Sequence, residues 1–244
     1  MPRSPRRPPD PGDALGDSDS DSDLDPGPAR IPDHVAFALA SSDPARTDPG
    51  DARPDLRGLV DGALAHGIGW LTLHVAGACP PAPALRTAVE RLVDAGAGDL
   101  AAGVRVRVAG RREGPADPAL LDLVDGAARR TADNRALTLT VALNYGGRQE
   151  ILDAVGALAS SGGRRTTVTE RALAAHLYQP DMPDPDLVVV VADERRVPDS
   201  FLWEVAYSEF VFLEGPPAGV GRADLDRAVA EYQRRHRRFG GIEG

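Results

Sequence analysis

The amino-acid sequence predicts one α/β domain with a mostly parallel central sheet flanked by helices. Short apolar runs of strand length alternate along the chain with longer segments whose apolar residues recur at helical spacing. The strand-like runs are apolar at successive positions, as expected for strands that helices cover on both faces. The length of 244 residues is sufficient to bury such a core without disulfides or metals.

Six segments are expected to form strands, because each is a short apolar or β-branched run bounded by polar residues, Gly or Pro. In chain order they are 34–40, 70–75, 104–109, 137–143, 187–191 and 210–213. Seven segments have helical spacing: 56–66, 85–100, 118–132, 148–160, 169–177, 201–207 and 224–237. Gly67 stands where the first helix would end, and Thr169 with Glu170 is typical of a helix start.

The first 30 residues differ from the rest of the chain. They are mainly Pro, Asp, Ser and Gly with almost no apolar content, and Asp alternates with Ser from Asp17 onward. Such a segment cannot bury enough surface to offset its chain entropy. We therefore expect residues 1–30 to be a disordered tail and residues 31–244 to form the folded domain.

Composition limits the function classes. All 28 basic residues are Arg, and 37 acidic residues outweigh them to leave a net charge of -9. This balance argues against a nucleic-acid binder, which relies on neutralising phosphates. The one cysteine, Cys79, excludes an intramolecular disulfide and suits a reducing compartment. The first 30 residues lack a secretory signal, and the most apolar run, 187–192, is too short to span a bilayer. We expect a cytoplasmic protein, with peripheral membrane contact left open.

Two segments carry candidate chemistry. Residues 143–148 (Leu-Asn-Tyr-Gly-Gly-Arg) follow a strand and open a helix. Free backbone amides, glycines and Arg148 would suit an anion there, although an ordinary strand-to-helix turn has the same pattern. Residues 186–212 contain a buried strand, a charged loop and Glu209. The loop would lie beyond the carboxyl end of its strand, where parallel sheets bind ligands.

Three motifs in these segments and at the C-terminus resemble the cis-prenyltransferases, the undecaprenyl diphosphate synthase family. They are Asn-Tyr-Gly-Gly-Arg at 144–148, Phe-Leu-Trp-Glu-Val-Ala-Tyr-Ser-Glu-Phe at 201–210 and Arg-Arg-Phe-Gly-Gly at 237–241. They occur in the family's order, and the likeness extends over residues 31–241. The resemblance implies a homodimeric α/β fold, magnesium, and the addition in cis of isopentenyl diphosphate to an allylic diphosphate.

The chain departs from the family after its first strand, where a family Asp organises magnesium and the allylic leaving group. Ala40 stands at that position, and Asp43 is the candidate substitute three residues later. The segments that align with further allylic-site elements, 48–50 and 77–81, have lost the family's phosphate donors. The resemblance therefore implies a degraded allylic site, with no catalytic residue assigned.

Other family positions are retained. The diphosphate-binding residues that the resemblance implies are Asn144, Arg148, Arg196, Arg238 and Gly240. Glu209 matches the family's magnesium-associated glutamate. Arg238 and Gly240 match a C-terminal Arg-x-Gly element that reaches across the dimer toward the partner's active site. In contrast, Val190 replaces an arginine of the isopentenyl diphosphate site.

These observations favour a catalytically silent accessory subunit of a heteromeric cis-prenyltransferase. Such a subunit would lend its C-terminal Arg-x-Gly element to a complete partner, as non-catalytic subunits of the family do. One alternative is an active but altered isoprenyl diphosphate transferase or cyclase with a rewired magnesium and diphosphate site. Another is a non-enzymatic binder of prenyl diphosphates or lipids. The expected assembly is a homodimer or a heterodimer with a complete cis-prenyltransferase.

Overall fold

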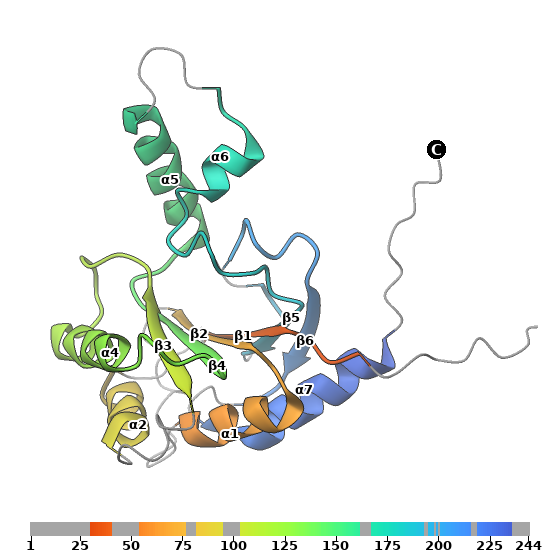
Figure 1. The fold of residues 1–244 in the computed structure, drawn as a ribbon. Coiled ribbons are helices and arrows are strands. Elements are labelled where there is room, and N and C mark those ends of the chain that lie inside the picture. Colours follow the sequence, from red (N-terminus) through yellow and green to blue (C-terminus); the bar gives the residue numbers. More distant parts are fainter. Residues whose placement is uncertain are drawn as a thin grey trace, which may run out of the picture.

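The computed structural model describes residues 30–40, 54–76, 82–94, 103–161, 167–192, 195–197, 199, 201–215 and 219–235. Its strands form one sheet in the order β3-β4-β2-β1-β5-β6, and every strand pair in it is parallel (Figure 1). The strands are β1 (His34–Ala40), β2 (Trp70–Ala76), β3 (Val104–Ala109), β4 (Leu137–Ala142), β5 (Leu187–Val191) and β6 (Glu209–Leu213). The predicted α/β domain with a parallel sheet is thus confirmed.

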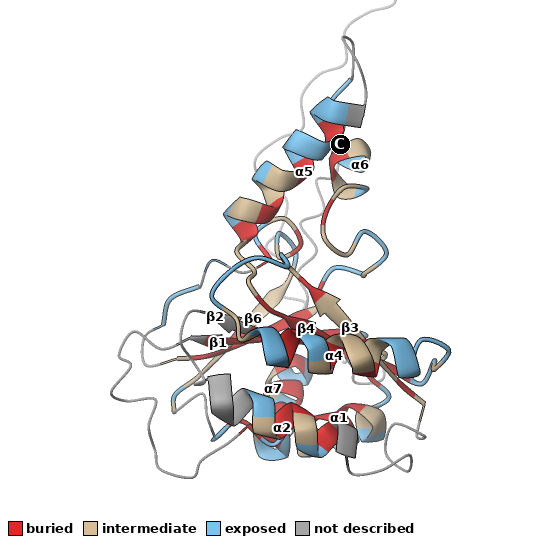
Figure 2. Cartoon of the chain, turned by 90° about the vertical axis from the view of Figure 1, so that its left-hand side faces the viewer, coloured by how far each residue is buried: buried red, intermediate tan, exposed pale blue. Residues whose placement is uncertain are grey.

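The helices divide between the two faces of the sheet. Their bounds are α1 (Leu56–His66), α2 (Ala82–Asp94), α4 (Pro118–Arg130), α5 (Gly147–Ser161), α6 (Glu170–Ala174) and α7 (Arg222–Arg234). Helices α1, α2, α4 and α7 cover one face, whereas α5 and α6 stand away from the other (Figures 1 and 2).

The main core lies between the sheet and the four covering helices. Because side chains alternate along a strand, Val35, Phe37 and Leu39 of β1 point into this core. The same core contains apolar residues of all four helices, such as Leu59 of α1 and Leu225 of α7. Each such side chain, when fully buried, contributes about 1.5–3 kcal/mol to the free energy of unfolding.

The opposite face of the sheet is lined by small residues. Ala36 and Ala38 of β1, Ala109 of β3 and Ala142 of β4 are at most 1% exposed there. Small side chains leave room for larger groups, and Phe201 packs on this face. This is the face from which α5 and α6 project, and it positions the site described below.

One predicted helix is wrong, and another is shorter than predicted. Residues 201–207 form consecutive turns, with backbone hydrogen bonds from Glu204 and Val205 to the oxygen of Phe201. Phe201 has φ of 50°, a conformation that a helix does not contain. The predicted helix 169–177 is shortened to α6, which Thr169 caps by accepting from the N–H of Ala172.

Some expectations fall outside the described residues. The predicted tail lies there except for Arg30, so its disorder stays a prediction. Within the described residues, no helix combines the length and the apolar character that crossing a bilayer requires.

Candidate functional site

Asn144 fixes the turn between β4 and α5. Its φ of 50° lies in the left-handed region, which Asn tolerates better than most residues. Its side-chain oxygen accepts from the N–H of Ala116 at 2.7 Å, and its amide nitrogen donates to the oxygen of Arg111 at 3.2 Å. Asn144 therefore holds the loop that follows β3, and its predicted role in diphosphate binding stays a prediction.

The start of α5 is already bonded to an anionic side chain. The backbone N–H of Arg148 donates to Oδ1 of Asp199 at 3.1 Å, and that of Gly147 donates to the backbone oxygen of Asp199 at 3.2 Å. A helix N-terminus attracts negative charge, and here the chain supplies that charge itself. A diphosphate could use these two amides only if Asp199 moved away.

Gly147 is required by protein packing. A Cβ on this residue would lie 2.7 Å from Cγ and 2.8 Å from the backbone nitrogen of Leu202. The sequence suggested that the glycines of 144–148 allow an anion to approach the backbone. In the structure the 201–207 segment occupies the space beside Gly147.

An aromatic cluster lies where β2, the β4–α5 turn and the 201–207 segment meet. It consists of His74, Tyr145 and Phe201, whose ring centroids lie 5.1–5.6 Å apart. His74 is 1% exposed, and burial lowers its pKa to about 4 despite a backbone hydrogen bond with Tyr145. His74 is therefore neutral at pH 7, and it can accept or donate a hydrogen bond but carries no charge for an anion.

Sequence reasoning missed two buried carboxyls beside this cluster, Glu150 and Glu204. Glu150 of α5 accepts a hydrogen bond from the hydroxyl of Tyr145, and burial raises its pKa. Glu204 of the 201–207 segment has its pKa raised to about 7, mainly by burial and next by the charge of Glu150. The available signal was Glu204 itself, an ionisable residue within the otherwise apolar run Phe-Leu-Trp-Glu-Val-Ala.

Glu209 lies far from the end of β1. Its register places it level with Val35, at the amino end of the sheet, whereas Ala40 ends β1 five residues further along. At about 3.3 Å per residue the two positions are roughly 16 Å apart along the strands. Within one chain, Glu209 and Ala40 therefore lie at opposite ends of the sheet.

The side chain of Glu209 has a basic neighbour but lacks a full complement of hydrogen bonds. Nη1 of Arg235 approaches Oε2 at 3.7 Å, while the same nitrogen donates to the oxygen of Phe210 at 2.6 Å. Oε2 is buried and has no hydrogen bond to any described residue. Among the described residues, no three His, Cys, Asp or Glu side chains are grouped to hold a metal ion. Asp43 lies outside the described residues, so the magnesium site that the resemblance implied stays a prediction.

The remaining predicted site residues are not brought together in the described parts of the chain. Ala40 pairs with Ala76 at the carboxyl edge of the sheet. Arg148 and Arg196 are exposed. Asp43, Arg238 and Gly240 lie outside the described residues. The diphosphate-binding roles of Arg148, Arg196, Arg238 and Gly240 stay predictions, as does the role of Asp43 as substitute for the family Asp.

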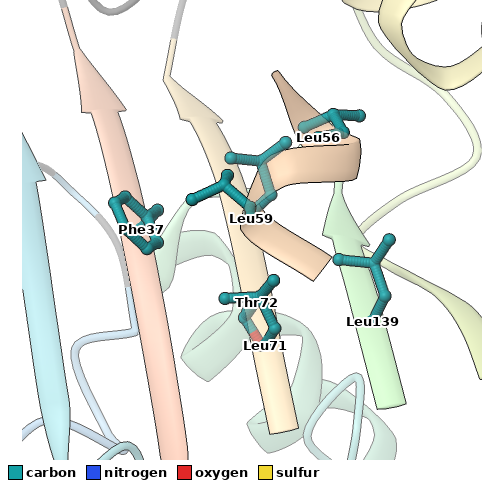
Figure 3. Close-up of a pocket in the computed structure, with 7 residues that line it drawn as sticks. Phe37, Leu56, Leu59, Leu71, Thr72 and Leu139 are labelled. Carbon is teal, nitrogen blue, oxygen red and sulfur yellow. The ribbon is translucent and has the colours of Figure 1, made fainter. Parts of the chain in front are cut away.

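An apolar recess lies between α1 and the sheet (Figure 3). Its lining comes from β1, β2, β4 and α1, and the side chains are Phe37, Leu56, Leu59, Leu71, Thr72, Leu73 and Leu139. The recess is too narrow to admit a water molecule. It is a packing gap of the main core and offers no space for a substrate in this conformation.

Sequence relatives support the resemblance. An isoprenyl transferase 2 of Bradyrhizobium diazoefficiens is 44% identical over 144 residues, which are 57% of this chain and 57% of that protein. An isoprenyl transferase of Thermotoga maritima is 40% identical over 141 residues, 57% of this chain and 60% of the relative. The chain thus matches less than two thirds of the length of these relatives.

Solved structures share the fold. A lavandulyl diphosphate synthase from Lavandula x intermedia, solved with dimethylallyl diphosphate, superposes with a TM-score of 0.73 at 23% identity, covering 86% of this chain and 98% of that one. A probable undecaprenyl diphosphate synthase from Campylobacter jejuni gives 0.67 at 20% identity, covering 86% and 99%. At these identities the likeness concerns the fold alone.

The family described as putative undecaprenyl diphosphate synthase matches residues 84–240. The match begins after β2, so the region of Ala40 and Asp43 lies outside it. The matched region is more than half of the chain and includes the first two motifs and residues 237–240 of the third. This chain therefore belongs to the undecaprenyl diphosphate synthase family of cis-prenyltransferases.

Proposed function

We propose that this chain is a catalytically silent accessory subunit of a heteromeric cis-prenyltransferase. The observation that carries the proposal is the end of β1 at Ala40, where the family has the Asp that organises magnesium and the allylic diphosphate. An allylic diphosphate ionises only when a metal ion and cationic donors take up the developing charge. Without that Asp, the chain's own allylic site lacks its central metal ligand.

The positions of the other candidate groups support the same proposal. Glu209, the carboxylate that matches the family's metal-associated glutamate, lies roughly 16 Å from Ala40 along the strands. The α5 N-terminus is bonded to Asp199.

In this proposal the chain contributes Arg238 and Gly240 to its partner. A guanidinium can bind a diphosphate through two parallel hydrogen bonds, a geometry that Lys cannot reproduce. Gly240 would allow the backbone to approach the phosphate closely, because it lacks a Cβ. The described chain ends at Arg235, which is anchored to β6 through the oxygen of Phe210. The element would therefore extend from a fixed point beside the sheet edge at β6.

A second function is an active but altered isoprenyl diphosphate transferase or cyclase. The names of the relatives favour it, because proteins 36–44% identical to this chain are isoprenyl transferases. In that case Asp43 or the nearby Asp48 and Asp51 would replace the family Asp as metal ligands.

Isoprenyl transfer assays separate the two functions. The chain, a complete cis-prenyltransferase from the same genome, and the co-expressed pair are each supplied with farnesyl diphosphate, isopentenyl diphosphate and Mg²⁺. An accessory subunit gives no product alone, co-purifies with the complete enzyme and raises its turnover. Turnover by the isolated chain would reject the accessory role. If Asp43→Ala then abolished this turnover, Asp43 would be assigned as a metal ligand of the altered site.

A further inference from the structure

The proposed function leaves the buried carboxyls Glu150 and Glu204 unused. Glu150 is 2% exposed and lies in the first turn of α5, while Glu204 is 6% exposed and lies in the 201–207 segment. Ionised carboxylates are rarely buried without a cation or a full set of donors, because transfer from water disfavours the charge. The two groups are coupled electrostatically, and both act on Tyr145.

Glu150 has hydrogen-bond donors for both oxygens. The hydroxyl of Tyr145 donates to Oε2, and the backbone N–H of Tyr178 donates to Oε1 at 2.9 Å. The titratable groups that act on it are Tyr145 and, on its own helix, Asp153. Burial raises the pKa of Glu150, and these two donors offset part of that rise because they stabilise the charged form.

Glu204 lacks such support. Its Oε2 is buried and has no hydrogen-bond partner among the described residues. The charged groups that act on it are Glu150 of α5 and Asp184 of the segment before β5, both acidic, and only the backbone N–H groups of Trp203 and Glu204 oppose them. The hydroxyl of Tyr145 is committed to Glu150. Protonation of Glu204 neutralises its carboxylate and so removes the repulsion between it and Glu150.

The 201–207 segment joins α5 and α6 to the sheet. Phe201 packs on the alanine-lined face, and Leu202 lies against Gly147 at the start of α5. Trp203 packs against the α5–α6 arm, by which we mean α5, α6 and the residues up to Leu177; its partners there are Ala154, Leu173 and Leu177. Phe201 keeps φ of 50°, which a bulky side chain adopts only where its surroundings enforce it. Charge on Glu204 would therefore affect a strained segment that connects the sheet to α5 and α6.

We propose that Glu204 is a proton-operated latch, which holds the 201–207 segment against α5 when protonated and loosens that contact when it loses its proton beside Glu150. The proton passes between the carboxyl of Glu204 and solvent, and no covalent bond changes. Loss of the proton with rising pH is expected near neutrality, because burial raises the pKa of Glu204 to about 7. The latch would respond near neutral pH, and it does not depend on the proposed catalytic silence.

Hydrogen exchange tests the latch on the whole chain at pH 6 and pH 8, after correction for intrinsic exchange rates. The wild type should lose protection in residues 201–208 and at the start of α5 by roughly tenfold at pH 8, since one pKa unit corresponds to a tenfold change in population. Glu204→Gln, a neutral isostere, should abolish this difference. Glu214→Gln is the matched control at an exposed glutamate, and it should respond as the wild type does.

A second measurement needs no variant. The infrared band of a protonated carboxyl should be present in the wild type at pH 6 and disappear as pH rises through about 7, above the range of an ordinary Glu. Absence of that band, equal protection at the two pH values, or a full response in Glu204→Gln would each overturn the proposal. Recovery of protection at pH 8 on adding Mg²⁺, in the wild type but not in Glu204→Gln, would assign the pair to a cation instead and also overturn it.

Discussion

The carboxylate of Asp199 accepts a hydrogen bond from the backbone N–H of Arg148, although the two residues are 51 positions apart in sequence. This bond connects the loop after β5 to the first turn of α5. It places a negative charge at the positive end of the helix, which is stabilising. It also means that the turn with the strongest anion-binding pattern in the sequence is closed by the chain itself.

Loss of this bond should destabilise the fold. Replacement of a side chain that caps a helix N-terminus costs about 0.5–2 kcal/mol, so Asp199→Ala should lower the free energy of unfolding by about 1 kcal/mol. Asp199→Asn keeps an acceptor and loses only the charge, and it should cost less. Urea unfolding at neutral pH measures both. An unchanged midpoint for Asp199→Ala would show that the bond does not hold the α5 start.

Replacement of two glycines of α5 by alanine should have opposite effects on the stability of the fold. In Gly147→Ala the new Cβ meets Leu202 at 2.7–2.8 Å, including a backbone atom, so we expect a loss of about 1–3 kcal/mol. Gly156 lies in the same helix, and a Cβ there meets nothing within 4 Å. Gly156→Ala should therefore stabilise by about 0.5–1 kcal/mol. Equal effects in thermal unfolding would contradict the close packing of the 201–207 segment.

Stability should fall in mild acid because His74 is buried and neutral. Its pKa is lowered from 6.5 to about 4, so between these values the unfolded chain takes up a proton that the folded chain does not. The stabilising contribution of neutral His74 is therefore fully present above pH 6.5. As pH falls toward 4, this contribution is lost and the free energy of unfolding decreases by up to about 3 kcal/mol.

His74→Phe keeps an aromatic ring beside Tyr145 and Phe201 but cannot titrate. It should flatten this part of the stability curve, as urea unfolding at several pH values would record. A residual slope is expected from His34, whose pKa burial also lowers to about 4. A curve unchanged by His74→Phe would show that His74 is not the group that titrates.

The elements of the sheet could be predicted well from sequence. The bounds expected for 34–40, 104–109 and 187–191 agree with β1, β3 and β5, because a short apolar run between polar residues leaves few alternatives. The turns of the 201–207 segment could not be predicted, because its apolar residues face three different partners. Phe201 packs on the sheet, Leu202 on Gly147 and Trp203 on the α5–α6 arm, so a helical pattern arose without a helix.

The family could be predicted from three short motifs, but the arrangement of the site could not. Asn144 and Gly147 suggested an anion site, and their structural partners lie in distant segments that sequence does not place beside them. Likewise, neither Glu150 nor Glu204 is unusual alone. Their importance arises only from burial next to each other, which depends on the packing of α5 against the 201–207 segment.

The proposed role rests most directly on Arg238. In a complex with a complete cis-prenyltransferase, Arg238→Ala in this chain should lower turnover at least about tenfold, since about 1.4 kcal/mol of lost transition-state binding is tenfold in rate. Arg234→Ala is the matched control: Arg234 is 72% exposed and pairs with Glu231 of its own helix, so its loss should be nearly silent. The complex itself should persist in both variants. An active complex in which Arg238→Ala has no effect, or the same effect as Arg234→Ala, would contradict the proposal that this chain completes its partner's active site.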